Sequence, residues 1–142
     1  PRTREAESPS GKEMEMIRAY LDIIQIRMGN RLRYQIDVPA SLNSLAFPPM
    51  LFQPLVENAV KHGLEPKVEG GTLTISAHSE NGKLQLALED DGLGFKGERS
   101  GGLGLANVRE RLAVLYDGQA ELILEERTPC GTRATIKLPN HG

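Results

Sequence analysis

Apolar residues recur every three or four positions in three stretches of the chain, and this spacing predicts three helices. The first helix is expected over residues 11–28, where Ser10-Gly11-Lys12-Glu13 has the spacing of a capping box. The second is expected over about 50–62, with Gly63 as its C-cap. Pro54 fits this helix only in its first turn. An apolar stripe after a glycine-rich segment predicts the third helix: Leu105, Val108, Leu112 and Leu115.

Polar and apolar residues alternate in five other stretches, and this alternation predicts strands. The strands are expected over residues 31–38, 71–79, 83–90, 120–126 and 132–139. Asn81-Gly82 is a strong hairpin signal, and Pro129-Cys130-Gly131 separates the last two strands. Hairpins pair strands in antiparallel fashion, and helices separated by hairpins indicate a sheet covered on one face. The predicted fold is an α/β (α+β) two-layer sandwich with a mixed, largely antiparallel sheet and about three helices.

The length of 142 residues suits one compact domain, with residues 1–10 as a flexible leader and 11–142 as the domain. A net charge of −2 provides no basic surface for nucleic acid. The single cysteine cannot form an internal disulfide, and the three histidines are scattered rather than grouped as metal ligands. No apolar run is long enough to span a membrane. Because the chain starts at Pro1 without an initiator methionine, we expect a fragment of a longer protein.

The first candidate for chemistry is LVENAVKHG, residues 55–63, in the second predicted helix. Lys61 and His62 follow Asn58 by three and four positions, so an α-helix would place them on the same face as Asn58. The amide oxygen of Asn58 suits magnesium, which takes few protein ligands and completes its shell with water and phosphate oxygens. Lys61 would then neutralise phosphate charge. The alternative is an ordinary solvated helix face.

The second candidate is DDGLGF, residues 90–95, at the end of a predicted strand. Its two glycines allow the backbone to bend sharply and to lie close to a flat ligand. Asp90, fixed at that bend, could accept a hydrogen bond from an exocyclic amine such as that of adenine. The alternative is a simple Asp-Gly turn that leaves the strand.

The third candidate is SGGLGLANVRERL, residues 100–112, in which glycines lead into a helix. The unpaired backbone N–H groups and the dipole of a helix N-terminus favour an anion. The Rossmann fingerprint fails in spacing and context, and the P-loop fails because no Gly-Lys-Ser/Thr closes the loop. This leaves a phosphate-binding helix start of another kind, or a linker followed by a helix.

In this order, the three segments resemble the Bergerat-type ATP-binding fold shared by gyrase, the heat-shock chaperone, histidine kinases and the mismatch-repair ATPase. They are similar to its Asn-bearing box, its Asp-x-Gly-x-Gly box and its second glycine box, and GTRATIKLP resembles its closing Gly-Thr strand. More narrowly, YLDIIQIRMGNRL, PPMLFQPLVENAVKHG and GLGLANVRERL resemble the LytS-type sensor histidine kinases of bacteria. This similarity runs from about residue 13 to residue 139.

The resemblance implies a role for each matching residue. Asn58 is expected to bind Mg²⁺, Lys61 to lie near the phosphates and His62 to lie beside the base or ribose. Asp90 is expected to bond the adenine amino group. Glu57 is expected to be catalytic, together with Asn58 and Lys61, or to orient the Asn-bearing box. The remaining residues expected to bind the nucleotide shape the pocket and its lid: Gly92, Gly94, Gly102, Leu103, Gly104, Leu105 and Thr132.

A short lid is expected over residues 96–101, where Lys96 or Arg99 would close on the γ-phosphate. ATPases of the superfamily place a water-activating glutamate one helical turn before the magnesium-binding Asn. That position is Pro54 here, and proline cannot accept a proton. The resemblance therefore favours a kinase. The alternatives are an ATP-hydrolysing, dimerising clamp and a non-catalytic nucleotide-sensing module.

The resemblance thus implies a protein-histidine kinase catalytic domain that binds ATP and Mg²⁺ and phosphorylates a histidine in a separate acceptor region of its parent. That region is expected upstream, so this chain should not label itself, and the helix over 11–28 would link to it. The parent is expected to be a homodimer anchored in the bacterial inner membrane that acts on a response regulator indirectly. The fragment itself is expected in the cytoplasm, without membrane or nucleic-acid contact.

Overall fold

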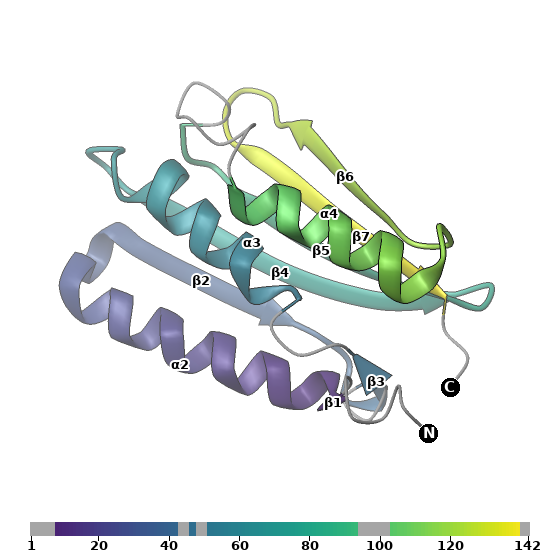
Figure 1. The fold of residues 1–142 in the computed structure, drawn as a ribbon. Helices are drawn as coiled ribbons and strands as arrows, with labels where there is room; N and C mark the ends of the chain where they lie inside the picture. The colour runs from purple at the N-terminus through teal and green to yellow at the C-terminus, as the bar shows by residue number, and fades with distance from the viewer. Residues whose placement is uncertain (1–7, 43–45, 48–50, 94–102, 140–142) are drawn as a thin grey trace.

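The computed structural model describes residues 8–42, 46–47, 51–93 and 103–139. Its main sheet has five strands in the order β2–β4–β5–β7–β6, and Figure 1 shows helices covering one face of it. β2 runs parallel to β4, whereas the other neighbouring pairs are antiparallel. The strands are β2 (Leu32–Asp37), β4 (Gly71–Glu80), β5 (Lys83–Asp90), β7 (Thr132–Pro139) and β6 (Glu121–Glu126). The predicted two-layer sandwich with a mixed, largely antiparallel sheet is confirmed.

The helices include the three that the apolar spacing predicts. In Figure 1, α3 lies between α2 and α4, and it continues directly into a π-helical segment, η3. These elements are α2 (Ser10–Met28), α3 (Gln53–Asn58), η3 (Ala59–Leu64) and α4 (Leu103–Tyr116). Shorter pieces complete the described chain: β1 (Ser8–Pro9), η1 (Gly29–Arg31), η2 (Ala40–Leu42) and β3 (Ala46–Phe47). Of the expected leader, residues 1–7 lie outside the described residues, and β1 pairs with β3.

The β4–β5 hairpin follows from its two turn residues. Asn81 has φ of 54° and Gly82 has φ of 75°, the left-handed conformations that a type I′ turn requires. This turn fixes the register from Glu80 opposite Lys83 to Leu73 opposite Asp90. Asp90 is therefore placed at the last position of β5, where the strand leaves the sheet.

The core lies between the sheet and its helices because the strands alternate in burial. Leu73 and Ile75 of β4 and Leu86 and Leu88 of β5 are buried in one cluster with residues of all three helices, including Ile17 of α2. Fully burying one such side chain contributes about 1.5–3 kcal/mol. Leu55 and Val56 of α3 are buried in the same cluster.

The second helix differs from its prediction at both ends. α3 begins at Gln53 rather than near residue 50, and Pro54 lies in its first turn, as predicted. The prediction that Gly63 is the C-cap is wrong, because Gly63 is buried inside η3 and Glu65 takes the C-cap position. The N–H of Glu65 donates to the carbonyl of Val60 at 2.8 Å. Local sequence did not reveal the π-helical turn, in which hydrogen bonds span one more residue than in an α-helix.

Candidate nucleotide-binding site

Two of the three predicted segments meet at a close backbone contact. Gly63, in η3, accepts a hydrogen bond from the N–H of Leu93 at 3.0 Å. Gly92 packs so tightly against it that a Cβ at residue 92 would lie 2.3 Å from the carbonyl oxygen of Gly63. Only a glycine fits there. The helical segment that carries Asn58 and the turn after Asp90 are thus joined directly.

Asp90 is a buried carboxylate at this junction. Its side chain is 1% exposed, and Oδ1 accepts a hydrogen bond from the N–H of Gly92 at 2.9 Å. Thr132, also buried, lies opposite Asp90 in the β5–β7 ladder. The hydrogen bond from Gly92 orients the Asp90 carboxylate, and strand pairing brings Thr132 beside it.

The main chain around Asp90 is also held from outside the turn. The carbonyl of Asp90 accepts from Arg127 Nη1 at 3.1 Å, and the carbonyl of Asp91 accepts from Lys67 Nζ at 2.7 Å. The Asp91 side chain accepts from the N–H of Thr72 at 2.8 Å. Sequence reasoning missed Lys67 and Arg127, because each acts on the backbone of a segment distant in sequence.

Asn58 is the last residue of α3, and its side chain is half-buried. Lys61 is exposed and His62 half-buried, and both belong to η3. The prediction of one shared face assumed α-helical geometry, in which each residue advances by 100°. In the wider π-helix each residue advances by less, which changes that relation, and such turns occur frequently at functional sites.

Glu57 makes a hydrogen bond within its own helix. Its Oε2 accepts a hydrogen bond from Gln53 Nε2 at 3.1 Å. Burial raises the pKa of the Tyr20 phenol in α2 above its usual value of 10.0, and the charges of Glu57 and Glu65 raise it further. The hydrogen bond from Gln53 ties the Glu57 carboxylate to its own helix.

Part of the predicted lid and pocket cannot be placed. Gly94, Lys96, Arg99 and Gly102 lie outside the described residues. Leu103, Gly104 and Leu105 form the first turn of α4, so the expected helix start after the glycines is present. The buried face of α4 includes Val108 and Leu112, whereas Leu115 is 38% exposed.

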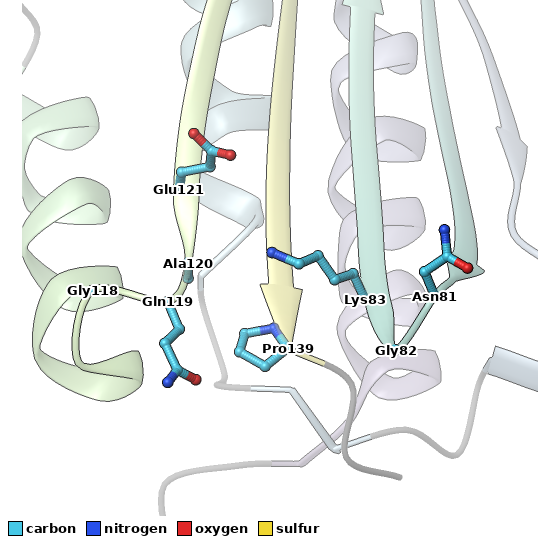
Figure 2. A pocket seen from close by; sticks show the side chains of 8 residues that line it. All are labelled: Asn81, Gly82, Lys83, Gly118, Gln119, Ala120, Glu121 and Pro139. Atoms are coloured by element: carbon cyan, nitrogen blue, oxygen red, sulfur yellow. The ribbon is translucent and has the colours of Figure 1, made fainter.

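A different hollow, of about 510 Å³, lies between the β4–β5 turn and the connection from α4 to β6. Figure 2 shows the residues that line it. Lys83, which begins β5, is part of its wall, whereas Asp90 ends the same strand. At about 3.4 Å per residue, the two positions are roughly 24 Å apart. The hollow is therefore separate from the junction of Gly63 and Gly92. Its wall comprises Asn81, Gly82, Lys83, Gly118, Gln119, Ala120, Glu121 and Pro139.

Within residues 8–42, 46–47, 51–93 and 103–139, no group of three His, Cys, Asp or Glu side chains could hold a metal ion. None of the described helices combines the length and the apolar character that crossing a membrane requires.

Most of this chain is similar in sequence to bacterial sensor proteins. The sensor protein LytS of Staphylococcus haemolyticus is 31% identical over 92% of this chain and 24% of its own length. The sensor histidine kinase BtsS of Escherichia coli K12 is 34% identical over 89% of this chain and 23% of its own length. The chain thus spans about a quarter of the curated relatives that it matches.

A solved structure supports the fold. The catalytic domain of the histidine kinase ThkA superposes with a TM-score of 0.71 at 15% identity, over 94% of this chain and 95% of that one. The predicted resemblance to the catalytic domains of LytS-type sensor histidine kinases is confirmed. Residues 49–142, more than half of the chain, match the family described as histidine kinase-, DNA gyrase B-, and HSP90-like ATPase. The chain belongs to this ATPase family.

Proposed function

We propose that the chain is the catalytic domain of a two-component sensor histidine kinase, which transfers the γ-phosphoryl group of Mg-ATP to a histidine in another region of its parent. One observation carries the proposal. The Asn58 segment and the Asp90 turn contact each other through Gly63 and the N–H of Leu93. Two segments that a nucleotide would need at its opposite ends are therefore fixed relative to one another.

At the adenine end, the proposal assigns Asp90 to the exocyclic amino group. Its carboxylate is buried and oriented by the N–H of Gly92, so an amine that reaches it gains a hydrogen bond to a charged acceptor. Gly92 would allow the base to approach the backbone, and Thr132 would form the floor of the pocket. His62 would lie beside the base or ribose.

At the phosphate end, the proposal assigns the metal to Asn58. Magnesium typically takes one or two protein ligands in phosphate sites, so one amide oxygen at the end of α3 fits it. When bound, the ion would neutralise charge on the phosphates. Lys61, an exposed cation one turn further on, would add to this neutralisation. Gly94, Gly102 and the first turn of α4 (Leu103, Gly104 and Leu105) would complete the lid and cradle the phosphates, and Lys96 or Arg99 would contact the γ-phosphate.

Phosphoryl transfer to a side chain is favoured over hydrolysis. Pro54 lies one turn before Asn58 and cannot act as a base. The Glu57 carboxylate accepts a hydrogen bond from Gln53 one turn earlier, and the proposal gives it an orienting role rather than that of a base for water. The work of this chain is then to position the phosphates and neutralise charge, which dominates catalysis in phosphoryl transfer.

The parent supplies the rest in this proposal. Residues 11–142 form the catalytic domain, and the helix over 11–28 links it to the acceptor region. The parent is a homodimer in the inner membrane whose phosphohistidine is passed to a response regulator. Because the proposal assigns the accepted phosphoryl group to a histidine in that other region, the chain on its own is expected not to label itself.

The test is transfer between separate molecules. The chain is incubated with radiolabelled Mg-ATP and a separately made acceptor-helix fragment of a LytS-type kinase. Label on the fragment and none on the chain is expected. Tight nucleotide binding without any transfer would favour a nucleotide-sensing module, and rapid steady-state hydrolysis by the chain alone would favour an ATP-driven clamp.

A further inference from the structure

Residues on one face of α2 contact both ends of the segment α3–η3, which carries Asn58. Glu13, Tyr20 and Arg27 are seven residues apart, so they lie almost in line along the helix. Glu13 contacts the start of α3, whereas Arg27 forms an ion pair with Glu65 just after η3. Between them, Tyr20 lies within the electrostatic influence of the acidic side chains of that segment.

Glu13 is the most buried member of this line. It is 1% exposed, and its Oε2 accepts hydrogen bonds from the N–H of Phe52 at 3.2 Å and from the N–H of Gln53 at 3.1 Å. Burying a carboxylate is strongly unfavourable unless it is well hydrogen-bonded. The two backbone donors of α3 help to meet this requirement.

The same two bonds complete the start of α3. The first N–H groups of a helix have no acceptor within the helix. Pro54 has no N–H, and the N–H of Leu55 donates to the carbonyl of Phe52 at 3.0 Å. The donors that remain are those of Phe52 and Gln53, which Glu13 binds. A negative charge is also favourable at this end of the helix dipole.

The position of Asn58 depends on how this short segment is held. α3 has 6 residues, too few to be stable without outside contacts. Its near end is fixed by Glu13, and the far end of η3 is fixed where Gly63 accepts from Leu93. Asn58 lies between these contacts, about 7.5 Å along the axis from Gln53.

We propose that Glu13 is a positioning residue, whose carboxylate fixes the axial position and rotation of α3 and so places the amide oxygen of Asn58 for its metal. This inference rests on the proposed function, because the placement matters only if Asn58 binds a metal. Loss of Glu13 then weakens the magnesium-dependent part of nucleotide binding. The adenine end, at Asp90, is unaffected.

The test is calorimetric titration of the chain with the imidotriphosphate analogue of ATP, with and without MgCl₂. The ratio of the two dissociation constants measures the gain in affinity from magnesium. We expect Glu13→Ala to lower this ratio roughly tenfold or more, as small misplacements at such sites do. The affinity without magnesium should stay unchanged. Glu13→Gln keeps an acceptor oxygen on a side chain of the same length. It should therefore retain most of the gain in affinity from magnesium.

Glu15→Ala is the matched control, because Glu15 is an exposed acid on the same helix, and it should keep the wild-type ratio. If the wild-type chain gains nothing from magnesium, the proposed function fails. If magnesium tightens binding by the wild-type chain, two results overturn the positioning role. In one, Glu13→Ala has the same gain in affinity from magnesium. In the other, Glu13→Ala loses affinity equally with and without magnesium. Should Glu13→Ala not fold by circular dichroism, Glu13→Asp decides, because a folded Glu13→Asp chain with the full ratio also overturns it.

Discussion

Asp90 is the residue on which recognition of the base depends in this account. One of its carboxylate oxygens is fixed by the N–H of Gly92, and its main chain is held by Arg127. A carboxylate oriented in this way selects an amino group over a carbonyl oxygen at the same place, because only an amino group can donate to it. The site should therefore prefer adenine to guanine.

We predict that Asp90→Asn lowers the affinity for ATP by about 1.5–3 kcal/mol, the usual value of a hydrogen bond to a charged group. The preference for ATP over GTP should fall with it, and calorimetric titration with each nucleotide measures both effects. Asp91→Asn is the control, since Asp91 instead accepts from the N–H of Thr72. Equal ATP affinity in wild-type and Asp90→Asn chains would contradict the assignment.

Two tyrosines link single residues to the pH dependence of stability. Burial raises the pKa of Tyr20 above 10.0, and a hydrogen bond to Asp22 raises the pKa of Tyr34. A raised pKa in the folded state means that the folded chain holds the proton more tightly than the unfolded chain. This contribution to stability is complete below about pH 10 and is lost as pH rises through the folded-state pKa values.

We therefore predict that the free energy of unfolding falls above about pH 10, and that Tyr20→Phe and Tyr34→Phe each make this fall shallower. Urea unfolding between about pH 8 and about pH 12 measures the slope. The double variant should have the shallowest slope. A slope that neither substitution changes would show that other groups cause the alkaline loss.

At the scale of the elements, the strands and hairpins follow from local sequence. The alternation of residues 71–79 and 83–90 and the Asn81-Gly82 turn are sufficient to predict β4 and β5 with their register. Each of these sequence patterns determines the structure of residues only a few positions away. The helices α2 and α4 likewise follow from one apolar stripe each.

The segment from α3 to η3 is less well predicted by local sequence, because residues distant in sequence determine where it begins and ends. Its start depends on the buried carboxylate of Glu13, from another helix. Its π-helical turn ends where Gly63 meets Gly92 and Leu93. No pattern within residues 50–64 reveals either contact. The sequence predicts the residues of the site through the resemblance, whereas the structure adds the contacts that hold them.

A substitution that adds one methyl group at residue 92 tests the contact between η3 and the turn after β5. A Cβ at residue 92 would lie 2.3 Å from the backbone oxygen of Gly63, which cannot move without shifting η3. We predict that Gly92→Ala lowers the free energy of unfolding by about 1–3 kcal/mol. It should also weaken nucleotide binding, because the Asn58 segment and the Asp90 turn are forced apart.

Gly82→Ala is the matched control for this prediction. Gly82 has φ of 75°, so an alanine there is strained, but no atom lies within 4 Å of its added Cβ. It should lower stability in urea unfolding while leaving nucleotide affinity at the wild-type value. If Gly92→Ala also leaves nucleotide affinity unchanged, the junction is not part of the site.

At the scale of the whole molecule, the helices on one face of the sheet leave the end of β5 beside the helical segment of Asn58 (Figure 1). In the proposed site, the nucleotide would bind where the two layers meet. A ligand in this place contacts both layers, so its binding should stabilise the fold as a unit. The chain covers about a quarter of its sensor-kinase relatives, and the acceptor histidine belongs to the remainder in the proposed mechanism.

The most direct test is calorimetric titration of wild-type and Asn58→Ala chains with the imidotriphosphate analogue, with and without magnesium. The account predicts that the wild-type chain binds and that magnesium tightens binding. It predicts that Asn58→Ala still binds the nucleotide but loses the gain from magnesium, because the protein ligand to the ion is gone. Equal affinities and equal magnesium dependence in the two chains would contradict it.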